Sequence, residues 1–508
     1  GGSLIGEAPE ISGLWFAEAV WVKDGPGVGK VVADWMTKGS PEYDPYGIDI
    51  ARFYPEQKQD DYVFGRCGEI AKKVYTPAVH PREPFETGRQ LFKSPFYERE
   101  VALGGYFMEA AGWERAHGYA ANEPTLLVKY RGQIPQRMNE WDSRHFWEVS
   151  NAEQLALSDD VGMVNLSHFA IYDIDGQSAE PLLEYLAVAK VGGATQVGKG
   201  VYTHFLDEKG GIRADLTIVR LSEDCFRVIC GGGTGHRDLV WIKQMAAARH
   251  ADIEIHNRTH QLATLGLWGP NARKVLASLV DDPNAVSDAK FPFATAANIE
   301  IEGIKIWAFR ISYVGELGWE LYFDFADGLQ LWDLFADAGV NPVGIETYAN
   351  SRRLEKSLRL QNADLETDYN LHEADLARKL VKKADFHGKA AYVAQKAADQ
   401  QASYLCTMVM LKNVDASGVA RYPVGEWPIL NKETREVLLD ELGRRSICTS
   451  VEYGPSLGSN IILGYIPAEF ASVGTELLLE YFCEEYPIRI EAVGYAPLLD
   501  PENLRVRS

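Results

Sequence analysis

The sequence has no long apolar run. None of its hydrophobic stretches approaches the roughly 18–20 residues that cross a bilayer, and its first residues lack the basic and then apolar pattern of a secretory signal. These absences argue against a helical membrane protein. We therefore expect a soluble protein that has no membrane partner.

Cysteine is scarce, with six residues in 508. The cysteines form no CxxC pair and have no His at ligand spacing, which argues against a disulfide framework and against a zinc site. We expect a reducing, intracellular compartment and no bound metal. The six residues are Cys67, Cys225, Cys230, Cys406, Cys448 and Cys483.

Positive charge is also in deficit. Asp and Glu number 72 against 51 Lys and Arg, which gives a formal net charge of −21. A field of that sign repels nucleic-acid phosphates and anionic lipid, so we expect no nucleic-acid partner. An anionic ligand would need a local cluster of Arg or Lys in this otherwise acidic protein.

What is present is the composition of an ordered globular protein, with 46% hydrophobic and 24% charged residues. At about 100–200 residues per domain, a chain of 508 residues predicts three or four domains. Near the start, Gly13–Val22 is apolar nearly throughout and predicts a strand buried on both faces. A helix should follow from about Val28 to Lys38 and end at Gly39.

The remaining chain divides into three patterns. Residues 51–123 are rich in aromatic and turn residues and suggest an irregular connecting domain, whereas the chain from Leu126 to about residue 400 alternates between helix and strand patterns. Two hairpins are expected there, Val201–Leu206 with Ile212–Leu221, and Lys305–Ile311 with Trp319–Phe323. From Ser403 onward, short strands at spacings of roughly 8–15 residues predict a small antiparallel barrel.

Six ordered segments resemble the folate-binding T-protein of the glycine cleavage system, and resemble still more its relatives in the dimethylglycine oxidase/dehydrogenase and sarcosine dehydrogenase family. Two earlier segments, GRQLFKSPFYERE (88–100) and GLWFAEAVWVKDGPGVGKVVADWMTKG (13–39), resemble the linker domain and the end of the FAD domain of those flavoproteins. The six segments are GGIRADLTIVRLSED (210–224), LGLWGPNARKVL (265–276), RISYVGELGWELY (310–322), RRLEKSLRL (352–360), KADFHGKAA (383–391) and GYAPLLDPENLR (494–505).

The resemblance implies an α+β fold, with a T-protein-like folate-binding domain followed by a small antiparallel β-barrel and preceded by the tail of an FAD (amino-acid-oxidase-like) domain. The implied divisions are residues 1–57 (FAD-domain remnant), 58–123 (linker domain), 124–400 (aminomethyltransferase-like folate domain) and 401–508 (barrel). The front of the flavin domain, with its GxGxxG turn, is absent from this sequence. We therefore expect FAD only together with a flavoprotein partner chain or an N-terminal half.

The resemblance implies an enzyme that passes one-carbon units to tetrahydrofolate. The units come from flavin-dependent oxidation of small N-methyl amines of the dimethylglycine or sarcosine type, and the product is methylenetetrahydrofolate. The expected location is the cytoplasm, or the mitochondrial matrix if the source is eukaryotic.

Asp215 is the residue that the resemblance assigns to catalysis, because a buried carboxylate beside the folate can manage one proton. Strand alternation puts Asp215 on one face with Arg213 and Thr217, and Ala214 and Leu216 on the other. That geometry alone also permits a solvated Asp. The surrounding GG-x-R-x-D-L-T context favours the site.

Four further residues are expected to bind the folate. By resemblance, Tyr313 and Glu320 contact the pterin, with the carboxylate accepting hydrogen bonds from its aminopyrimidinone edge. Arg353 matches a basic residue near the folate tail, and Tyr202 completes the set. The plainer interpretations are a tyrosine on a strand edge, a surface glutamate and surface charge on a helix.

Several positions depart from the family pattern. Where the family has Gly, an aromatic residue and then Trp-Gly, this chain has Ser357, Leu358, Gln361 and Asn362. These changes leave two alternatives open. The chain could be a non-catalytic regulatory or scaffolding relative, or a folate-dependent demethylase of another methyl donor.

Overall fold

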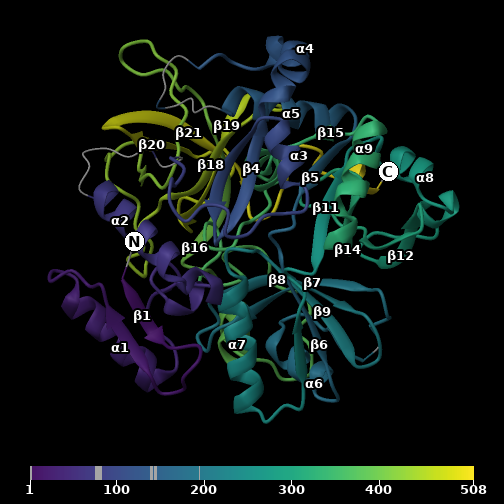
Figure 1. Cartoon of the computed structure of the whole chain (residues 1–508). Helices are drawn as coiled ribbons and strands as arrows, with labels where there is room; N and C mark the ends of the chain where they lie inside the picture. Colours follow the sequence, from purple (N-terminus) through teal and green to yellow (C-terminus); the bar gives the residue numbers. More distant parts are fainter. Residues whose placement is uncertain are drawn as a thin grey trace.

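The structure is a computed structural model, which describes residues 3–74, 80, 83–137, 141, 146–193 and 195–507. Three large sheets, of five, six and six strands, dominate these residues, and two small two-stranded sheets accompany them. In the described part of the chain, no helix combines the length and apolar character needed to span a membrane. The sheets and their covering helices form distinct lobes (Figure 1).

The N-terminal segment folds as a two-stranded sheet and a helix. Strand β1 (Leu4–Glu7) pairs with β2 (Trp15–Glu18), and α1 (Gly25–Lys38) follows. The helix ends as expected at Gly39, whose φ of 85° lies in the left-handed region that glycine adopts at low cost.

The buried strand expected at Gly13–Val22 is wrong in both extent and burial. Strand β2 covers only four residues, and Val22 is 97% exposed. The reason is that β2 pairs along one edge with β1, and its Trp15 packs against Trp35 of α1, with ring centroids 5.7 Å apart. Pairing with β1 was not foreseen, and one helix covers only one face of a short ribbon.

The connecting segment holds helices and one hairpin. Strand β3 (Gly105–Ala110) pairs with β4 (Trp113–Tyr119). Phe96 from this segment stacks on Trp332 at 5.1 Å and belongs to the hydrophobic core of the first six-stranded sheet. Its helices are α2 (Asp60–Val74) and α3 (Tyr97–Ala102), and α4 (Val128–Tyr130) and α5 (Trp147–Asp159) follow it.

The five-stranded sheet has the order β10-β6-β9-β8-β7. Its expected hairpin is confirmed, because β7 pairs antiparallel with β8 and places His204 opposite Asp215. Helices α6 (Ala179–Leu186) and α7 (Gly235–Ala248) contribute to the hydrophobic core on one face. The strands are β6 (Ala170–Asp175), β7 (Gly200–Leu206), β8 (Ile212–Arg220), β9 (Cys225–Cys230) and β10 (Glu254–Asn257).

The first six-stranded sheet has the order β12-β13-β14-β11-β5-β15, and the second expected hairpin is present as β13 paired with β14. Helices α8 (Ala272–Leu279) and α9 (Gly328–Asp337) contribute to its core. The strands are β5 (Gly162–Asn165), β11 (Leu262–Trp268), β12 (Ala296–Ile301), β13 (Ile304–Phe309), β14 (Gly318–Asp324) and β15 (Asn341–Pro342).

These two sheets meet through a small shared core. Ile171, Val219 and Ile229 of the five-stranded sheet pack with Phe309 and Tyr322 of the six-stranded sheet. The contact fixes how the strands of one sheet lie relative to those of the other. Side chains at the ends of β7, β8 and β14 can therefore face a common space.

The C-terminal barrel is confirmed as a six-stranded antiparallel sheet in the order β17-β20-β21-β16-β19-β18. A bridge between Pro428 and Ile447 joins its two ends and closes it. The strands are β16 (Ser403–Met410), β17 (Ile429–Leu430), β18 (Cys448–Gly454), β19 (Ser459–Pro467), β20 (Glu476–Tyr481) and β21 (Glu484–Val493). The remaining helices are α10 (Arg352–Glu355), α11 (Lys389–Ala397) and α12 (Leu504–Arg507).

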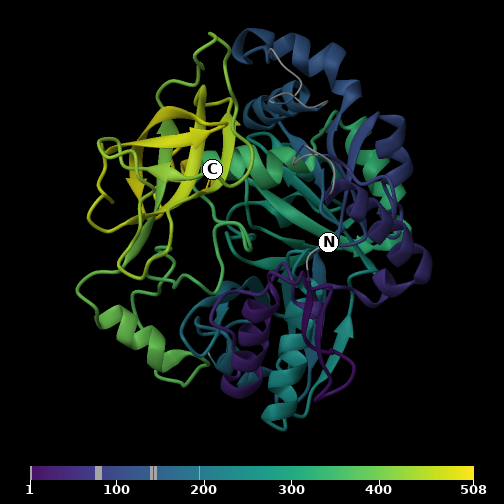
Figure 2. The ribbon, with the colours of Figure 1, turned by 90° about the vertical axis from the view of Figure 1, so that its left-hand side faces the viewer.

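The barrel lies in a different part of the molecule from the five-stranded sheet and the N-terminal segment. Figure 2 shows the barrel on one side and the five-stranded sheet below, with the N-terminal helix α1 in the same lower part of the molecule as that sheet in both views. Helix α10 contacts β18 and β19 of the barrel. The segment that follows α10 therefore lies next to the barrel.

Candidate functional site

Asp215 lies on β8 opposite His204 of β7. The His204 Nε2 atom is 3.2 Å from the Tyr202 hydroxyl and 3.9 Å from Asp215 Oδ1. The rings of Tyr202 and His204 meet edge to face at 4.9 Å. Two adjacent strands thus bring a carboxyl, an imidazole and a phenol to one place.

The Asp215 side chain is neither fully buried nor solvated, with 14% of its area exposed. Burial raises its pKa from 3.8 to about 7, while the Tyr202 hydroxyl acts in the opposite direction. Burial lowers the pKa of His204 to about 3, so this imidazole is neutral. A carboxyl that titrates near neutral pH is able both to hold and to release a proton there.

Tyr313 lies in the turn between β13 and β14 and is anchored at both ends. Its hydroxyl donates to the Arg359 carbonyl oxygen at 2.5 Å, and its ring lies 5.1 Å from that of Tyr348. Tyr348 in turn stacks on Trp268 at 5.6 Å. Tyr313 is therefore part of an aromatic wall, and its ring orientation is set before any ligand arrives.

Glu320 lies on β14 and is 6% exposed. Its Oε2 accepts a hydrogen bond of 2.5 Å from the Tyr322 hydroxyl, and burial raises its pKa from 4.5 to about 7. The notion of a surface glutamate is wrong. A buried carboxyl with one internal partner keeps acceptor capacity for a ligand.

Tyr348, which sequence reasoning missed, contacts Tyr313 and is influenced by two further expected residues. Burial raises the pKa of Tyr348 well above 10, and Glu320, Tyr313 and Asp215 add to that effect. Burial likewise raises the pKa of Tyr202, and Asp215 and Tyr313 add to it. These side chains therefore act on one another electrostatically, and an aromatic residue before the RRLE segment was the only sequence signal for Tyr348.

Arg353 does not join this group as expected. It is 2% exposed, and its guanidinium donates to Asp364 Oδ2 at 2.5 Å and to Ser450 Oγ at 2.6 Å. It also donates to the carbonyl oxygens of Ala349 and Leu358. Arg353 is therefore neither a surface charge nor a cation available to a ligand, because internal acceptors occupy most of its N–H groups.

Arg359 is a better placed cation, which the motif did not single out. Its guanidinium is buried, with Nε and Nη2 unpartnered, and its central carbon lies 5.2 Å from the ring of Tyr495. Tyr202 and Asp364 are among the groups that influence its pKa, which burial lowers. It therefore lies between the domain that holds Asp215 and the C-terminal segment.

Two departures from the family pattern keep a backbone shape that glycine would favour. Ser357 and Asn362 have φ values of 52° and 62°. Ser357 compensates with hydrogen bonds from its side chain to Thr407 and to the Ala496 carbonyl oxygen, both at 3.0 Å. The loop between α10 and the barrel is thus held in place although its glycines are replaced.

Three family profiles match successive parts of the chain. They are described as "FAD dependent oxidoreductase central domain" (residues 38–94), "GCVT N-terminal domain" (96–384) and "Glycine cleavage T-protein C-terminal barrel domain" (425–493). The second alone covers more than half of the 508 residues.

Individual proteins agree with these matches. The mitochondrial dimethylglycine dehydrogenase of Rattus norvegicus is 31% identical over 95% of this chain and 53% of its own length. The mitochondrial sarcosine dehydrogenase of Mus musculus is 27% identical over 80% of this chain and 48% of its own length. The chain thus spans about half the length of the curated relatives it matches.

Among solved structures, the glycine cleavage system aminomethyltransferase T from Bartonella henselae superimposes with a TM-score of 0.63 at 22% identity. The match covers 81% of this chain and 99% of that protein. This likeness concerns the fold.

Proposed function

This chain belongs to the T-protein-like family of dimethylglycine and sarcosine dehydrogenases, and we propose that it binds tetrahydrofolate and passes one-carbon units to it. The units come from oxidation of an N-methyl amine of the dimethylglycine or sarcosine type, and the product is methylenetetrahydrofolate. The relatives that it resembles are enzymes. The identity of the amine is part of the proposal.

The observation that carries this proposal is that Asp215, Tyr313 and Glu320 all act on Tyr348, while Asp215 and Tyr313 also act on Tyr202. Both carboxyls have pKa values of about 7 because they are buried. A pterin offers a flat ring for the tyrosines and N–H groups for a carboxylate, and therefore suits this lining. Tetrahydrofolate supplies the amine nitrogens that accept the one-carbon unit.

The side chains of this protein have separate tasks in that scheme. Glu320 accepts N–H groups of the pterin, and Tyr313 holds its ring against the aromatic wall. Asp215 takes up the proton that leaves when the new carbon–nitrogen bond forms, a role that suits a carboxyl titrating near neutral pH. We propose Arg359, in place of Arg353, as the cation nearest to the anionic part of the ligand, because its Nε and Nη2 are unpartnered.

The proposal also includes FAD, without naming the residues that bind it. Residues 38–94 match an FAD-dependent oxidoreductase domain, and residues 3–74 as described contribute one two-stranded sheet and two long helices. We propose that the flavin is held together with a flavoprotein chain or domain that packs against this segment. The domain limits at 57, 123 and 400, and a cytoplasmic or mitochondrial location, likewise remain predictions.

Calorimetry with folinic acid tests the folate site. We expect saturable 1:1 binding, and we expect Glu320→Gln to weaken it by about 1–3 kcal/mol, because a charge-assisted hydrogen bond is lost. Asp215→Asn should bind folinic acid normally and lower methylene transfer by roughly 10²-fold, since it removes only the proton acceptor. Wild-type protein that does not bind folinic acid would instead support the non-catalytic alternative.

A further inference from the structure

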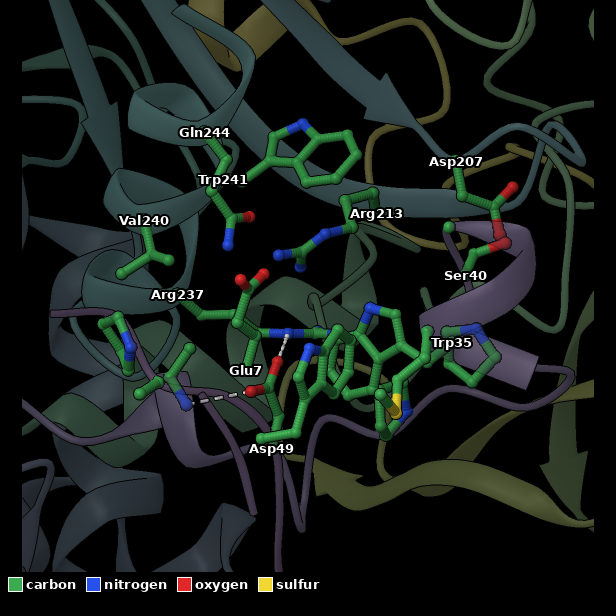
Figure 3. A pocket seen from close by; sticks show the side chains of 18 of the residues that line it. Glu7, Trp35, Ser40, Asp49, Asp207, Arg213, Arg237, Val240, Trp241 and Gln244 are labelled. Atoms are coloured by element: carbon green, nitrogen blue, oxygen red, sulfur yellow. Dashed lines mark hydrogen bonds and ion pairs between the residues drawn. The ribbon is translucent and has the colours of Figure 1, made fainter. Parts of the chain in front are cut away.

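A cavity of about 600 Å³ lies between the N-terminal segment and the domain that holds Asp215. One wall comes from Glu7, Trp15 and Trp35, and the other from residues of β8 and α7. Figure 3 shows Arg213 reaching into this space, between Trp241 and the hydrogen-bonded pair of Arg237 and Asp49. A volume of this size is typical of small-molecule sites.

Arg213 is the unusual feature of the cavity. Among the described residues it makes no hydrogen bond and no ion pair, and its Nη1 atom is buried without a partner. Its guanidinium carbon lies 5.1 Å from the centre of the Trp241 ring. Burial lowers its pKa from 12.5 to about 10, Arg237 acts in the same direction, and Asp238, Asp49 and Asp44 oppose the shift.

The neighbouring Arg237 differs from Arg213, because carboxylates pair with its guanidinium. It pairs with Asp49 and Asp44, each at 3.0 Å, and these acceptors occupy its guanidinium. Arg213 differs in that no carboxylate of the described residues pairs with it, although Asp238, Asp49 and Asp44 act on its charge. Its Nη1 is buried without a partner and it lines the cavity, where an anionic ligand can meet it.

The rest of the lining fits a cation beside that anion. The carboxylate of Glu7 faces the cavity and accepts one hydrogen bond, from the Gly13 amide at 2.7 Å. Trp15, Trp35 and Trp241 supply aromatic faces, which attract alkylated ammonium groups. A ligand that carries both a carboxylate and a methylated ammonium would place the carboxylate on Arg213 and the ammonium beside Glu7 and the tryptophans.

We propose that this cavity is a binding site for a zwitterionic N-methylated amino acid, with its carboxylate on Arg213 and its ammonium near Glu7 and the tryptophans. The choice of an N-methylated amine rests on the proposed function. Arg213 and Asp215 lie on the same face of β8, two residues apart. Asp215, Tyr313 and Glu320 do not line the cavity, so the site adjoins the proposed folate pocket but is distinct from it.

An NMR titration of the full chain with dimethylglycine, by saturation transfer, tests the site. We expect saturable binding at millimolar concentration that Arg213→Gln weakens by about tenfold or more, the effect of losing a charge-assisted hydrogen bond. Dimethylaminoethanol, which lacks the carboxylate, should bind as weakly to wild type as dimethylglycine binds to the variant. Lys243→Gln is the matched control, because it removes the same charge from an exposed residue of the same cavity.

Folinic acid separates this inference from the proposed function. Arg213→Gln should bind folinic acid like wild type, which shows that the variant is folded, although it loses the contact with the Trp241 ring. Equal dimethylglycine affinity in wild type and Arg213→Gln, no saturable binding to wild type, or displacement of dimethylglycine by folinic acid would each overturn the proposed site. Failure of folinic acid to bind would overturn the folate site alone.

Discussion

Glu320→Gln should make the stability of the folded chain less dependent on pH. Burial raises the pKa of the Glu320 carboxyl from 4.5 to about 7, with one hydrogen bond from Tyr322 opposing the shift. The folded state therefore holds this proton more tightly than the unfolded chain. The stability contributed by Glu320 is fully present below pH 4.5 and is lost as the pH rises through about 7.

The size of the effect follows from the shift. A difference of about 2.5 pKa units corresponds to about 3 kcal/mol of unfolding free energy, of which about 2–3 kcal/mol is lost between pH 5 and pH 8. Glutamine does not ionise, and its side-chain oxygen still accepts from Tyr322. The Glu320→Gln variant should therefore not lose this part of its unfolding free energy as the pH rises.

The assay is urea unfolding at pH 5 and at pH 8, followed by tryptophan fluorescence, for wild type and variant. All other titrating groups cancel in the double difference, which should be about 2–3 kcal/mol in favour of the variant at pH 8. Glu300→Gln is the control, because Glu300 is exposed on β12 and keeps its water on folding. The same pH dependence in wild type and Glu320→Gln would refute a raised pKa for the buried Glu320 carboxyl.

Two further substitutions test the packing around the site. Gly318→Ala should lower the free energy of unfolding by about 3 kcal/mol or prevent folding, because the added Cβ would lie 1.9 Å from the Leu267 carbonyl oxygen. A wild-type thermal unfolding temperature in this variant would contradict the close approach of β14 to β11. Arg353→Gln should also lower the free energy of unfolding by about 3 kcal/mol, because it leaves the buried Asp364 carboxylate without its ion-pair partner. Normal stability with weaker folinic acid binding in this variant would instead make Arg353 a ligand-binding residue.

Much of the architecture could be predicted from the sequence, and the expected fold class is confirmed. The two hairpins, the late strands of the barrel and the end of α1 at Gly39 all follow from short-range rules. The alternation of β8 is an example, since Ala214 and Leu216 are buried while Arg213 and Asp215 are partly exposed. Such features depend on residues close together in the chain, whose geometry the backbone fixes.

Tertiary structure alone decided which side chains have partners. Arg353 and Arg359 are alike in sequence, yet packing of the barrel gives Arg353 its acceptor Ser450, 97 residues away, and leaves two nitrogens of Arg359 unpartnered. The same holds for Arg213 and Arg237, because only Arg237 meets Asp44 and Asp49 of the N-terminal segment. A charge is satisfied by groups that arrive from distant segments, and no local pattern specifies that arrival.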